Sequence, residues 1–398
     1  MSPRVARTPE MVFRLPWHLV AVALGLLVLA ALALSPRVAS AEELAEPALA
    51  EAQAAIVTDQ VGNVLYGKNV DAQINMASIT KVMTAVVALE SEKPLDETYE
   101  LQEPTELQPE AVVAGYHAGQ TSTLRDLFNV MLVKSANDAA WEVATICAGS
   151  EEAFVNKMNE KAAELGMTNT HFANSHGLDA EGHHSSVADL AKLARYAMQT
   201  HPLIAKTVRQ RSVTLPVAGI PTTFETSDDL LYTYEGILGI KTGAGNTVTS
   251  FLGSARRDGT TLYTCVLGCE TKQGRFDDTE RLLDWAWDTY DAYTLADSSA
   301  PLAVLPFSLG FGWSCVARPD LTTTGLVWPQ GGTTTYVRYL APDAAFAAPG
   351  DVVADCQWVQ DGRVVATASY SAAQRLVPTY SGFGPLDRMN QARADLAA

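Results

Sequence analysis

The segment MASITKVMTAVVALES, residues 76–91, constrains the fold more than any other part of the sequence. Its spacing predicts a helix with apolar side chains on nearly every face, and such a helix is normally buried in a core. The same helix carries Ser78 and, three residues later, Lys81. An unpaired ammonium group in a core costs several kcal/mol or gives up its proton. The chain therefore needs a reason to bury a lysine beside a serine.

One such reason is chemical, because a serine and a lysine in an SxxK pattern project from the same face of a helix. Desolvation lowers the pKa of a buried lysine, so its neutral amine can take the proton of the Ser78 hydroxyl. The helix N-terminus also offers a backbone N–H to a developing oxyanion. The alternative, a capping serine with a surface lysine, is disfavoured because the neighbours of Lys81 around the helix are apolar or threonine.

A second motif, Ser135-Ala136-Asn137, falls between two expected helices. By itself it is typical of an ordinary loop with a helix cap. Beside an SxxK pair, a second hydroxyl can relay a proton and an amide can hold both ends of a substrate peptide bond.

A third motif, Lys241-Thr242-Gly243, ends an expected strand. The lysine and the threonine can bind a carboxylate by charge and hydroxyl, while Gly243 lets a substrate backbone approach the strand. A phosphate-binding loop is the rival interpretation. It fails, because the spacing GILGIKT is not GxxxxGK[ST] and the lysine does not open a helix.

In the order SxxK, SxN and KTG, the three motifs resemble the signature of the active-site-serine penicillin-recognising superfamily. The chain is similar to its D-alanyl-D-alanine carboxypeptidase branch from about residue 54 to 287. Strings that carry the resemblance include AAIVTDQVGNVLYGKN, KSANDAA, NSHGLDAEGHHSS and Arg275-Phe276. The resemblance implies an α+β fold of the β-lactamase/transpeptidase type.

The resemblance also implies catalytic roles for the first two motifs. Ser78 would attack the carbonyl of the penultimate D-alanine, with Lys81 as its base. Ser135 would pass the proton toward the leaving D-alanine, and Asn137 would orient the substrate.

For the third motif, the resemblance implies that Lys241 and Thr242 grip the terminal carboxylate. The backbone N–H groups of Ser78 and Ala244 would form the oxyanion hole. β-Lactams would acylate the same serine, and no cofactor is implied. The string AGNTVTSFLG after the motif departs from the family pattern.

Periodicity predicts an antiparallel sheet packed by a helical cluster and followed by a small all-β domain. Expected helices cover residues 76–91, 124–133, 138–148, 151–165, 187–199 and 279–293. Expected strands cover a hairpin at residues 54–68, about Gly62 and Asn63, and residues 212–217, 237–241, 248–255 and 261–267. The expected domains are a signal peptide at 1–41, a catalytic domain at 42–295, a β-rich domain at 296–384 and a tail at 385–398.

The first segment has the layout of a secretory signal, with basic residues, an apolar run from Leu19 to Leu34 and the cleavage string Ala39-Ser40-Ala41. An uncleaved anchor is the alternative, and either way the body of the protein is exported. An exported protein is permitted disulfides, and Cys315 with Cys356 is the expected pair. At least one of the five cysteines is expected to be an inert core thiol.

Composition bounds the partners. With 398 residues and a net charge of -17, the chain is large enough for two domains and too acidic to favour nucleic acid. Five of its seven histidines lie between His171 and His201, but their spacing matches no zinc motif, and no metal is expected. The tail is too short and too weakly apolar for a membrane-lying helix, and peripheral association with the membrane or the cell wall is an alternative.

We therefore expect a secreted serine carboxypeptidase that removes the terminal D-alanine from peptidoglycan stem pentapeptides. One alternative is a penicillin-binding scaffold or regulator with little turnover. A β-lactamase is the other, and it is disfavoured because no ExxLN-like string lies between SxN and KTG.

Overall fold

The computed structural model describes most of the chain between residues 45 and 373. The described residues are 45–102, 107, 111–246, 248–299, 303–306, 314–341 and 347–373, with only the backbone described at 303–306 and 314–316. The expected signal peptide, 1–41, and the expected tail, 385–398, lie outside these ranges. Among the described residues, no helix is both long enough and apolar enough to cross a membrane.

The central element is a five-stranded sheet with strand order β2-β1-β9-β8-β7, in which every neighbouring pair is antiparallel. Its strands are β1 (Ala54–Thr58), β2 (Val64–Lys68), β7 (Ile237–Ala244), β8 (Thr249–Arg257) and β9 (Thr260–Cys269). The predicted hairpin is confirmed as β1 and β2, and the last three predicted strands as β7, β8 and β9. The KTG motif ends β7, which is an edge strand and leaves one side open to a ligand.

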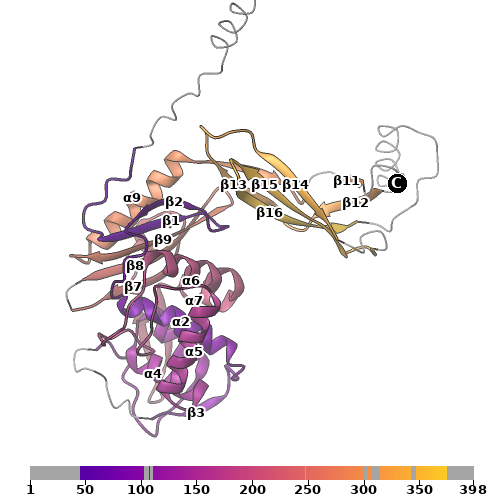
Figure 1. Cartoon of the computed structure of the whole chain (residues 1–398). Helices are drawn as coiled ribbons and strands as arrows, with labels where there is room; N and C mark the ends of the chain where they lie inside the picture. The colour runs from indigo at the N-terminus through magenta and orange to yellow at the C-terminus, as the bar shows by residue number, and fades with distance from the viewer. Residues whose placement is uncertain are drawn as a thin grey trace, which may run out of the picture. The chain divides into compact units, whose positions relative to one another are not determined.

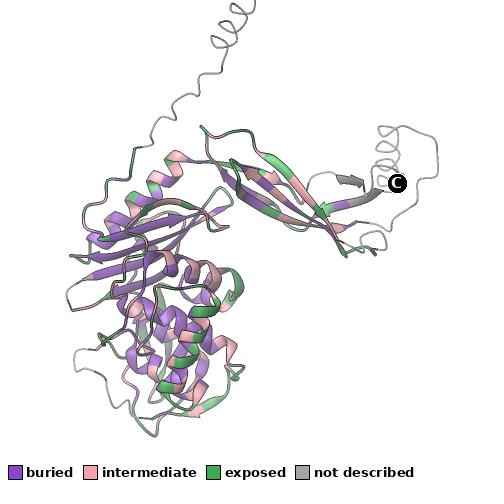
Figure 2. Cartoon of the chain, viewed as in Figure 1, coloured by how far each residue is buried: buried purple, intermediate pink, exposed green. Residues whose placement is uncertain are grey.

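Helices cover both faces of this sheet (Figure 1). They are η1 (Ala77–Ile79), α2 (Thr80–Glu90), α3 (Leu124–Val133), α4 (Asn137–Ala148), α5 (Glu151–Glu164), α6 (Val187–Thr200), α7 (Pro202–Thr207), α8 (Leu230–Thr233) and α9 (Gly274–Thr289). Alternate residues of β1 belong to different cores, because side chains of a strand point to opposite faces. Ala54 and Ile56 pack with α2 to α6, whereas Ala55 and Val57 pack with α9. The predicted burial of α2 is confirmed (Figure 2).

Local sequence explains where several helices begin and end. Thr123, Ser150 and Ser186 each accept a hydrogen bond from the backbone N–H three residues later. These N-caps fix the starts of α3, α5 and α6, which match the predicted helices closely. Gly149, with a φ of 84°, ends α4 in the left-handed region that glycine adopts readily.

The helix predicted at residues 279–293 is partly wrong. α9 begins earlier, at Gly274, and ends at Thr289, and the next residues form a strand, β10 (Asp291–Ala296). Tyr290 leaves the helical path with φ −117° and ψ 134°, and its ring packs 6.1 Å from that of Trp285. β10 then gains a ladder with β13 (Thr323–Val327), a long-range pairing that helical spacing cannot reveal.

Four short strands complete the N-terminal part of the fold. The predicted strand at 212–217 is confirmed as β5 (Ser212–Val217), and it pairs with an unforeseen β6 (Ile220–Glu225). The connecting residues Ala218 and Gly219 have φ values of 50° and 77°, as a two-residue hairpin turn requires. β3 (Thr98–Glu100) pairs with β4 (Thr121–Thr123).

The described residues of the C-terminal region after α9 form strands and turns and no helix, as predicted. Its second sheet has the order β11-β12-β16-β15-β14 and consists of β11 (Ala303–Pro306), β12 (Ser314–Pro319), β14 (Thr335–Leu340), β15 (Val352–Gln360) and β16 (Arg363–Ala372). Residues of the sheet itself, among them Val353, Cys356 and Trp358 of β15, form a small core on it. The domain boundary expected at residue 296 stays a prediction, and β10 already spans it.

The expected disulfide between Cys315 and Cys356 is wrong. Cys315 lies in β12 and Cys356 in β15, and β16 runs between these two strands. A disulfide needs Cα atoms within about 7 Å, which two strands separated by a third do not offer. Cys356 is a buried free thiol, 2.7 Å from the hydroxyl of Tyr336. The prediction of inert core thiols is confirmed, because burial raises the pKa of Cys265 well above its ordinary 9.0.

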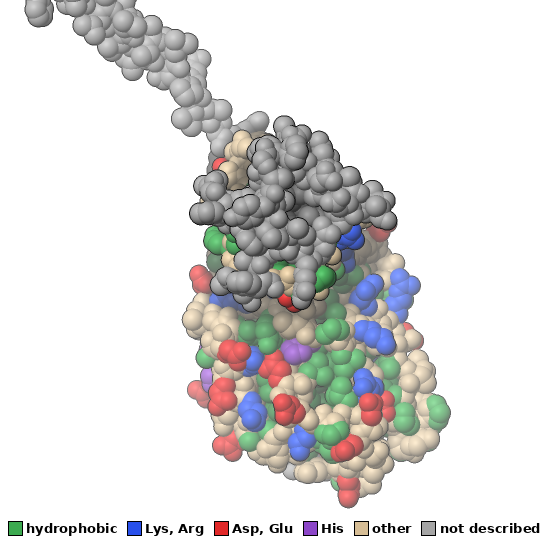
Figure 3. Space-filling view, turned by 90° about the vertical axis from the view of Figure 1, so that its right-hand side faces the viewer, with side chains coloured by type: hydrophobic (Ala, Val, Ile, Leu, Met, Phe, Trp, Pro, Cys, Tyr) green, Lys and Arg blue, Asp and Glu red, His purple; other side chains and the backbone are tan. Residues whose placement is uncertain are grey.

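On the face shown in Figure 3, acidic and basic side chains are interspersed. Hydrophobic side chains occur there in small groups between them. The net negative charge of the chain is therefore not gathered into one patch on this face.

Candidate active site

Ser78 lies in the 3₁₀ turn η1, directly before α2. Two glycines from distant segments press against this turn. A side chain at Gly177 would collide with the backbone of Ala77, and a Cβ at Gly243 would lie 2.7 Å from the Met76 carbonyl oxygen. We expected Gly243 to admit a substrate backbone, whereas its close neighbour in the structure is the serine turn itself. The close backbone contacts of these two glycines thus determine the position of the turn that carries Ser78.

Lys81, one turn later on α2, is completely buried. Its Nζ lies 2.9 Å from Ser78 Oγ, 2.7 Å from Asn137 Oδ1 and 2.5 Å from the His176 carbonyl oxygen. Burial, followed by the like charge of Lys241, lowers its pKa well below the ordinary 10.5, and Asp138 opposes the shift. The predicted direction of this pKa shift and its predicted cause, desolvation, are confirmed.

The partners of Lys81 determine which way its amine faces. The Asn137 and His176 oxygens can only accept, so they take two N–H bonds of a neutral amine. The remaining lone pair then faces the Ser78 hydroxyl, which can donate. This arrangement suits a general base within hydrogen-bond reach of its nucleophile.

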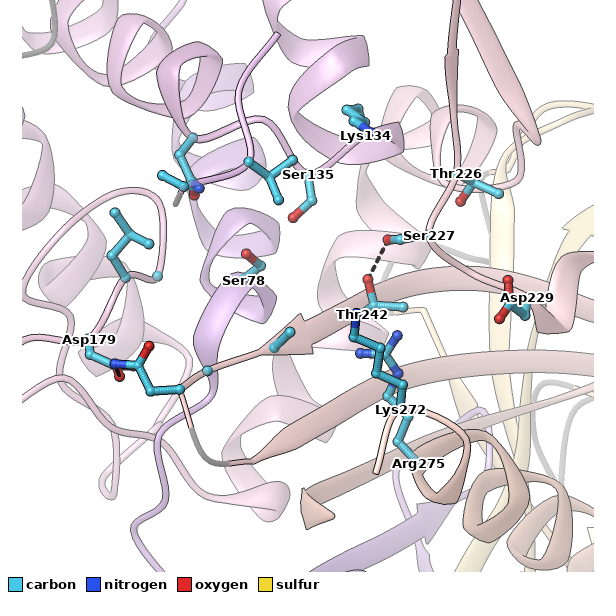
Figure 4. A pocket seen from close by; sticks show the side chains of 18 of the residues that line it. Ser78, Lys134, Ser135, Asp179, Thr226, Ser227, Asp229, Thr242, Lys272 and Arg275 are labelled. Carbon is cyan, nitrogen blue, oxygen red and sulfur yellow. Dashed lines mark hydrogen bonds between the residues drawn. The ribbon is translucent and has the colours of Figure 1, made fainter. Parts of the chain in front are cut away.

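The SxN motif lies between α3 and α4. Ser135 has a φ of 69°, is 8% exposed, and points toward Ser78 (Figure 4). Asn137 opens α4, and its backbone N–H donates to the Val112 carbonyl at 2.7 Å. The motif thus presents a hydroxyl to the serine and an amide to the lysine.

A neighbouring carboxylate, which the sequence did not single out, shapes the wall next to this motif. Asp138 accepts hydrogen bonds from the backbone N–H groups of Ala114, Gly115 and Tyr116. It therefore holds the segment that includes Val112 against the start of α4.

The KTG strand contributes two chemically different groups. Thr242 lines the cavity, with its Oγ1 2.5 Å from Ser227 Oγ (Figure 4). Lys241 is only 1% exposed and is not among the described residues that line the cavity. Burial, followed by the charge of Arg275, lowers the pKa of Lys241 to about 7, while Asp228 opposes the shift. Lys241 therefore lies behind the cavity wall, out of direct contact with the cavity.

Arg275, at the start of α9, is the main site residue that sequence reasoning missed. It lines the cavity and donates from Nη1 to the Gly243 carbonyl at 2.8 Å. Its buried Nε has no hydrogen-bond partner among the described residues. A guanidinium in this position can bind a carboxylate. The string Arg275-Phe276 belonged to the resemblance, and that signal could have identified the residue.

A cavity of about 560 Å³ unites these groups. Five of the eight predicted site residues line it, and they are Ser78, Ser135, Asn137, Thr242 and Ala244. The other three are buried in contact with or beside these residues, and they are Lys81, Lys241 and Gly243. The structure thus brings all eight together from three separate stretches of the chain.

The histidines near this cavity have structural roles. His183 Nε2 lies 2.8 Å from Thr80 Oγ1, and its Nδ1 accepts from the Ala173 N–H. Burial is the main cause that lowers the pKa of His183 to about 4 and that of His176 to about 3, so both rings are neutral. Among the described residues, no three side chains of His, Cys, Asp or Glu are arranged to hold a metal ion.

The chain matches a known family. The family model of D-alanyl-D-alanine carboxypeptidases, Peptidase S11, matches residues 40–271. The D-alanyl-D-alanine carboxypeptidase DacF of Bacillus subtilis is 29% identical over 268 residues, which cover 65% of this chain and 68% of DacF.

Solved structures show the same likeness. Penicillin-binding protein D2 of Listeria monocytogenes, in its cefotaxime-bound form, is 33% identical, with a TM-score of 0.55 over 60% of this chain and 99% of that one. A peptidoglycan synthesis regulatory factor (PBP3) of Streptococcus pneumoniae is 21% identical, with a TM-score of 0.68 over 82% of this chain and 99% of that one. The second likeness concerns the fold alone, and it extends past the region that the family model matches.

Proposed function

Because the chain belongs to the D-alanyl-D-alanine carboxypeptidase family and is therefore a serine peptidase, we propose that it hydrolyses the terminal D-alanine of peptidoglycan stem pentapeptides through an acyl-enzyme on Ser78. The observation that carries this proposal is the position of Lys81. Its Nζ lies 2.9 Å from Ser78 Oγ while two other oxygens occupy its N–H bonds.

In the first step, Ser78 Oγ attacks the carbonyl carbon of the penultimate D-alanine while Lys81 takes the hydroxyl proton. The backbone N–H groups of Ser78 and Ala244 stabilise the tetrahedral oxyanion. The C–N bond then breaks, and Ser135 delivers the proton to the departing amine of D-alanine. The product is an ester between Ser78 and the shortened peptide.

The substrate is a peptide that ends in a free carboxylate. Arg275 and the hydroxyls of Thr242 and Ser227 line the same end of the cavity, and this cluster supports carboxylate binding there. The buried charge of Lys241 strengthens the attraction, and the amide of Asn137 orients the peptide. Lys272, which also lines the cavity, adds to its positive charge.

In the second step, water attacks the ester carbonyl, its proton passes to Lys81, and the C–Oγ bond breaks. Ser78 regains its proton and the tetrapeptide leaves. A β-lactam carries an amide and a carboxylate in a similar arrangement, so the same serine opens its ring. The relative of known structure is described with cefotaxime bound, which supports this assignment.

Members of this family act at the cell envelope, and we propose that residues 1–41 export this chain there. Retention by membrane or cell wall, and the absence of a nucleic-acid partner, stay predictions.

A paired assay tests the function. The wild-type protein should release D-alanine from diacetyl-Lys-D-Ala-D-Ala and be labelled by a fluorescent penicillin, and Ser78→Ala should do neither. Labelling without release would favour the scaffold, and rapid nitrocefin turnover would favour a β-lactamase. Release at the wild-type rate by Ser78→Ala would exclude the proposed mechanism.

A further inference from the structure

A carboxylate at the rim of the cavity joins two segments that are far apart in sequence. Asp179 Oδ2 accepts a hydrogen bond from Asn246 Nδ2 at 2.5 Å, and its Oδ1 accepts one from Asn75 Nδ2 at 2.6 Å. Asn246 lies in the turn between β7 and β8, whereas Asn75 precedes η1. Asp179 itself lies in the loop between α5 and α6, and it lines the cavity on the other side of Ser78 from Lys272 and Arg275 in Figure 4.

We call the hydrogen bonds of Asp179 to Asn75 and to Asn246 the Asp179 bridge. Each of these two asparagines lies close in sequence to a residue whose N–H belongs to the proposed oxyanion hole. Asn75 Oδ1 accepts from the backbone N–H of Ala77 at 2.8 Å, one residue before Ser78. Asn246 follows Ala244 by two residues, in a turn closed by the Gly245 N–H and the Val248 carbonyl at 2.9 Å. One carboxylate therefore lies between the two backbone segments that supply the hole.

The hydrogen-bonding capacity of the three side chains matches this arrangement. An ionised carboxylate only accepts, and each asparagine amide donates one N–H to it. Hydrogen bonds to a charged acceptor are shorter and about twice as strong as neutral ones. Asn246 belongs to the string AGNTVTSFLG, where this chain departs from the family resemblance. One partner of Asp179 thus lies in the segment in which this chain differs from the family pattern.

We propose that Asp179 is a positioning residue, which holds the β7–β8 turn and the Ser78 turn at the spacing that lets both N–H groups reach one oxyanion. This role rests on the proposed function. Asp179 touches neither the nucleophile nor the carboxylate-binding groups, so its loss moves the hole and leaves substrate binding largely intact. Because removal of a whole oxyanion donor costs about 100-fold to 1000-fold in kcat, displacement of one should cost about tenfold.

An exchange of the two side chains tests the bridge. Asp179→Asn keeps one acceptor oxygen and sets an amide against an amide, and Asn246→Asp sets two carboxylates against each other. In the double variant Asp179→Asn/Asn246→Asp, residue 179 donates to residue 246 and still accepts from Asn75. Both hydrogen bonds are restored, and the donor and acceptor of one are exchanged. Asp71→Asn is the matched control, because Asp71 and Asn169 form another exposed aspartate–asparagine pair at 3.2 Å, away from the cavity.

Three readouts are measured on the purified protein. These are kcat and KM for D-alanine release, the penicillin acylation rate, and amide hydrogen exchange of the β7–β8 turn. We expect kcat and acylation to fall about tenfold in both single variants, more in Asn246→Asp, with KM nearly unchanged. Exchange of the turn should rise in parallel, and the double variant should recover most of both losses. Asp71→Asn should match wild type.

The outcomes separate this proposal from the function on which it rests. Normal activity and normal exchange in both single variants would overturn the bridge. Raised exchange with unchanged kcat would show a structural bond without a positioning role, which also overturns the proposal. A wild-type protein that neither releases D-alanine nor binds penicillin would overturn the proposed function, and with it the positioning role.

Discussion

Lys81 has two N–H acceptors, Asn137 Oδ1 and the His176 carbonyl, and a third neighbour, Ser78 Oγ, that can either donate or accept. At the scale of single residues, an ammonium would donate to all three oxygens, whereas a neutral amine donates to two and offers its lone pair to the hydroxyl. Burial and the charge of Lys241 act in the same direction on its pKa. Burial of Lys81, which is costly for a charged lysine, therefore also favours the neutral form that can act as a base.

Replacing Lys81 tests this account. Lys81→Arg keeps a positive charge but supplies no base, because a guanidinium is not deprotonated in proteins. We expect penicillin acylation to fall at least about 100-fold, the lower range for loss of a general base. Lys192→Arg, a change at a partly exposed lysine of α6, should acylate normally. Normal acylation by Lys81→Arg would refute the role of Lys81 as base.

The pH dependence of turnover tests the two buried lysines together. Lys81 works when neutral, and its lowered pKa means that kcat should rise with pH and level off well below pH 10.5. Lys241 assists when charged, and its pKa is about 7, so KM should rise as the pH increases past about 7. Raising the pH thus helps the step that needs neutral Lys81 and weakens the binding that needs charged Lys241. We therefore expect kcat/KM to pass through a maximum. Steady-state kinetics from mildly acidic to alkaline pH measure this, and a KM independent of pH would count against Lys241.

At the scale of elements, the position of the Ser78 turn depends on backbone segments that touch it without a side chain between them. Gly177 lies against Ala77, and Gly243 of β7 lies against Met76. The edge strand, the loop after α5 and the start of α2 are thereby held together. This contact requires glycine, because any Cβ would enter the neighbouring backbone.

Alanine substitutions at two glycines of the same loop distinguish the effect of this contact from that of backbone strain alone. Gly177 and Gly182 have φ values of 90° and 77°, so alanine at either position costs about 1 kcal/mol or more in backbone strain. Only Gly177→Ala adds a collision with the serine turn, since a Cβ at Gly182 would meet its nearest atom at an ordinary 3.6 Å. We expect Gly177→Ala to lose about 1–3 kcal/mol more unfolding free energy than Gly182→Ala. It should also acylate more slowly than Gly182→Ala. Denaturant unfolding measures the free energy and penicillin labelling measures acylation. Equal losses of stability and of acylation rate in the two variants would contradict this prediction.

At the scale of the whole molecule, packed cores account for the fold without a disulfide among the described cysteines. Two clusters line the faces of the first sheet, and a third lies on the second sheet. Cys356 is part of the third cluster as a free thiol. An oxidising compartment permits disulfides, yet strand order keeps the expected pair apart.

Chemical labelling checks this arrangement. When the unreduced protein is denatured and alkylated, we expect mass spectrometry to find the reagent on Cys147, Cys265, Cys269 and Cys356. The melting temperature should also be the same with and without a reductant, since no bond among these thiols is broken. A peptide in which Cys315 and Cys356 remain linked would contradict the strand order.

The sequence by itself determined most features that arise within one element or from motifs in a fixed order. Helical spacing predicted α2 to α6, and side-chain caps set the starts of α3, α5 and α6. Two β-prone runs about a Gly-Asn turn predicted the hairpin of β1 and β2. The SxxK pair was predictable because residues three apart on a helix share a face. The order of the three motifs, through the family resemblance, identified the other site residues.

Only the tertiary structure decided what depends on segments distant in the chain. It separated Cys315 from Cys356, ended α9 early in favour of a strand pair, and set Gly243 against the serine turn. It also brought Arg275 to the cavity and joined Asn75 to Asn246 through Asp179. These contacts leave no periodic trace, because each depends on where two independent backbones meet in space and not on the spacing within either one.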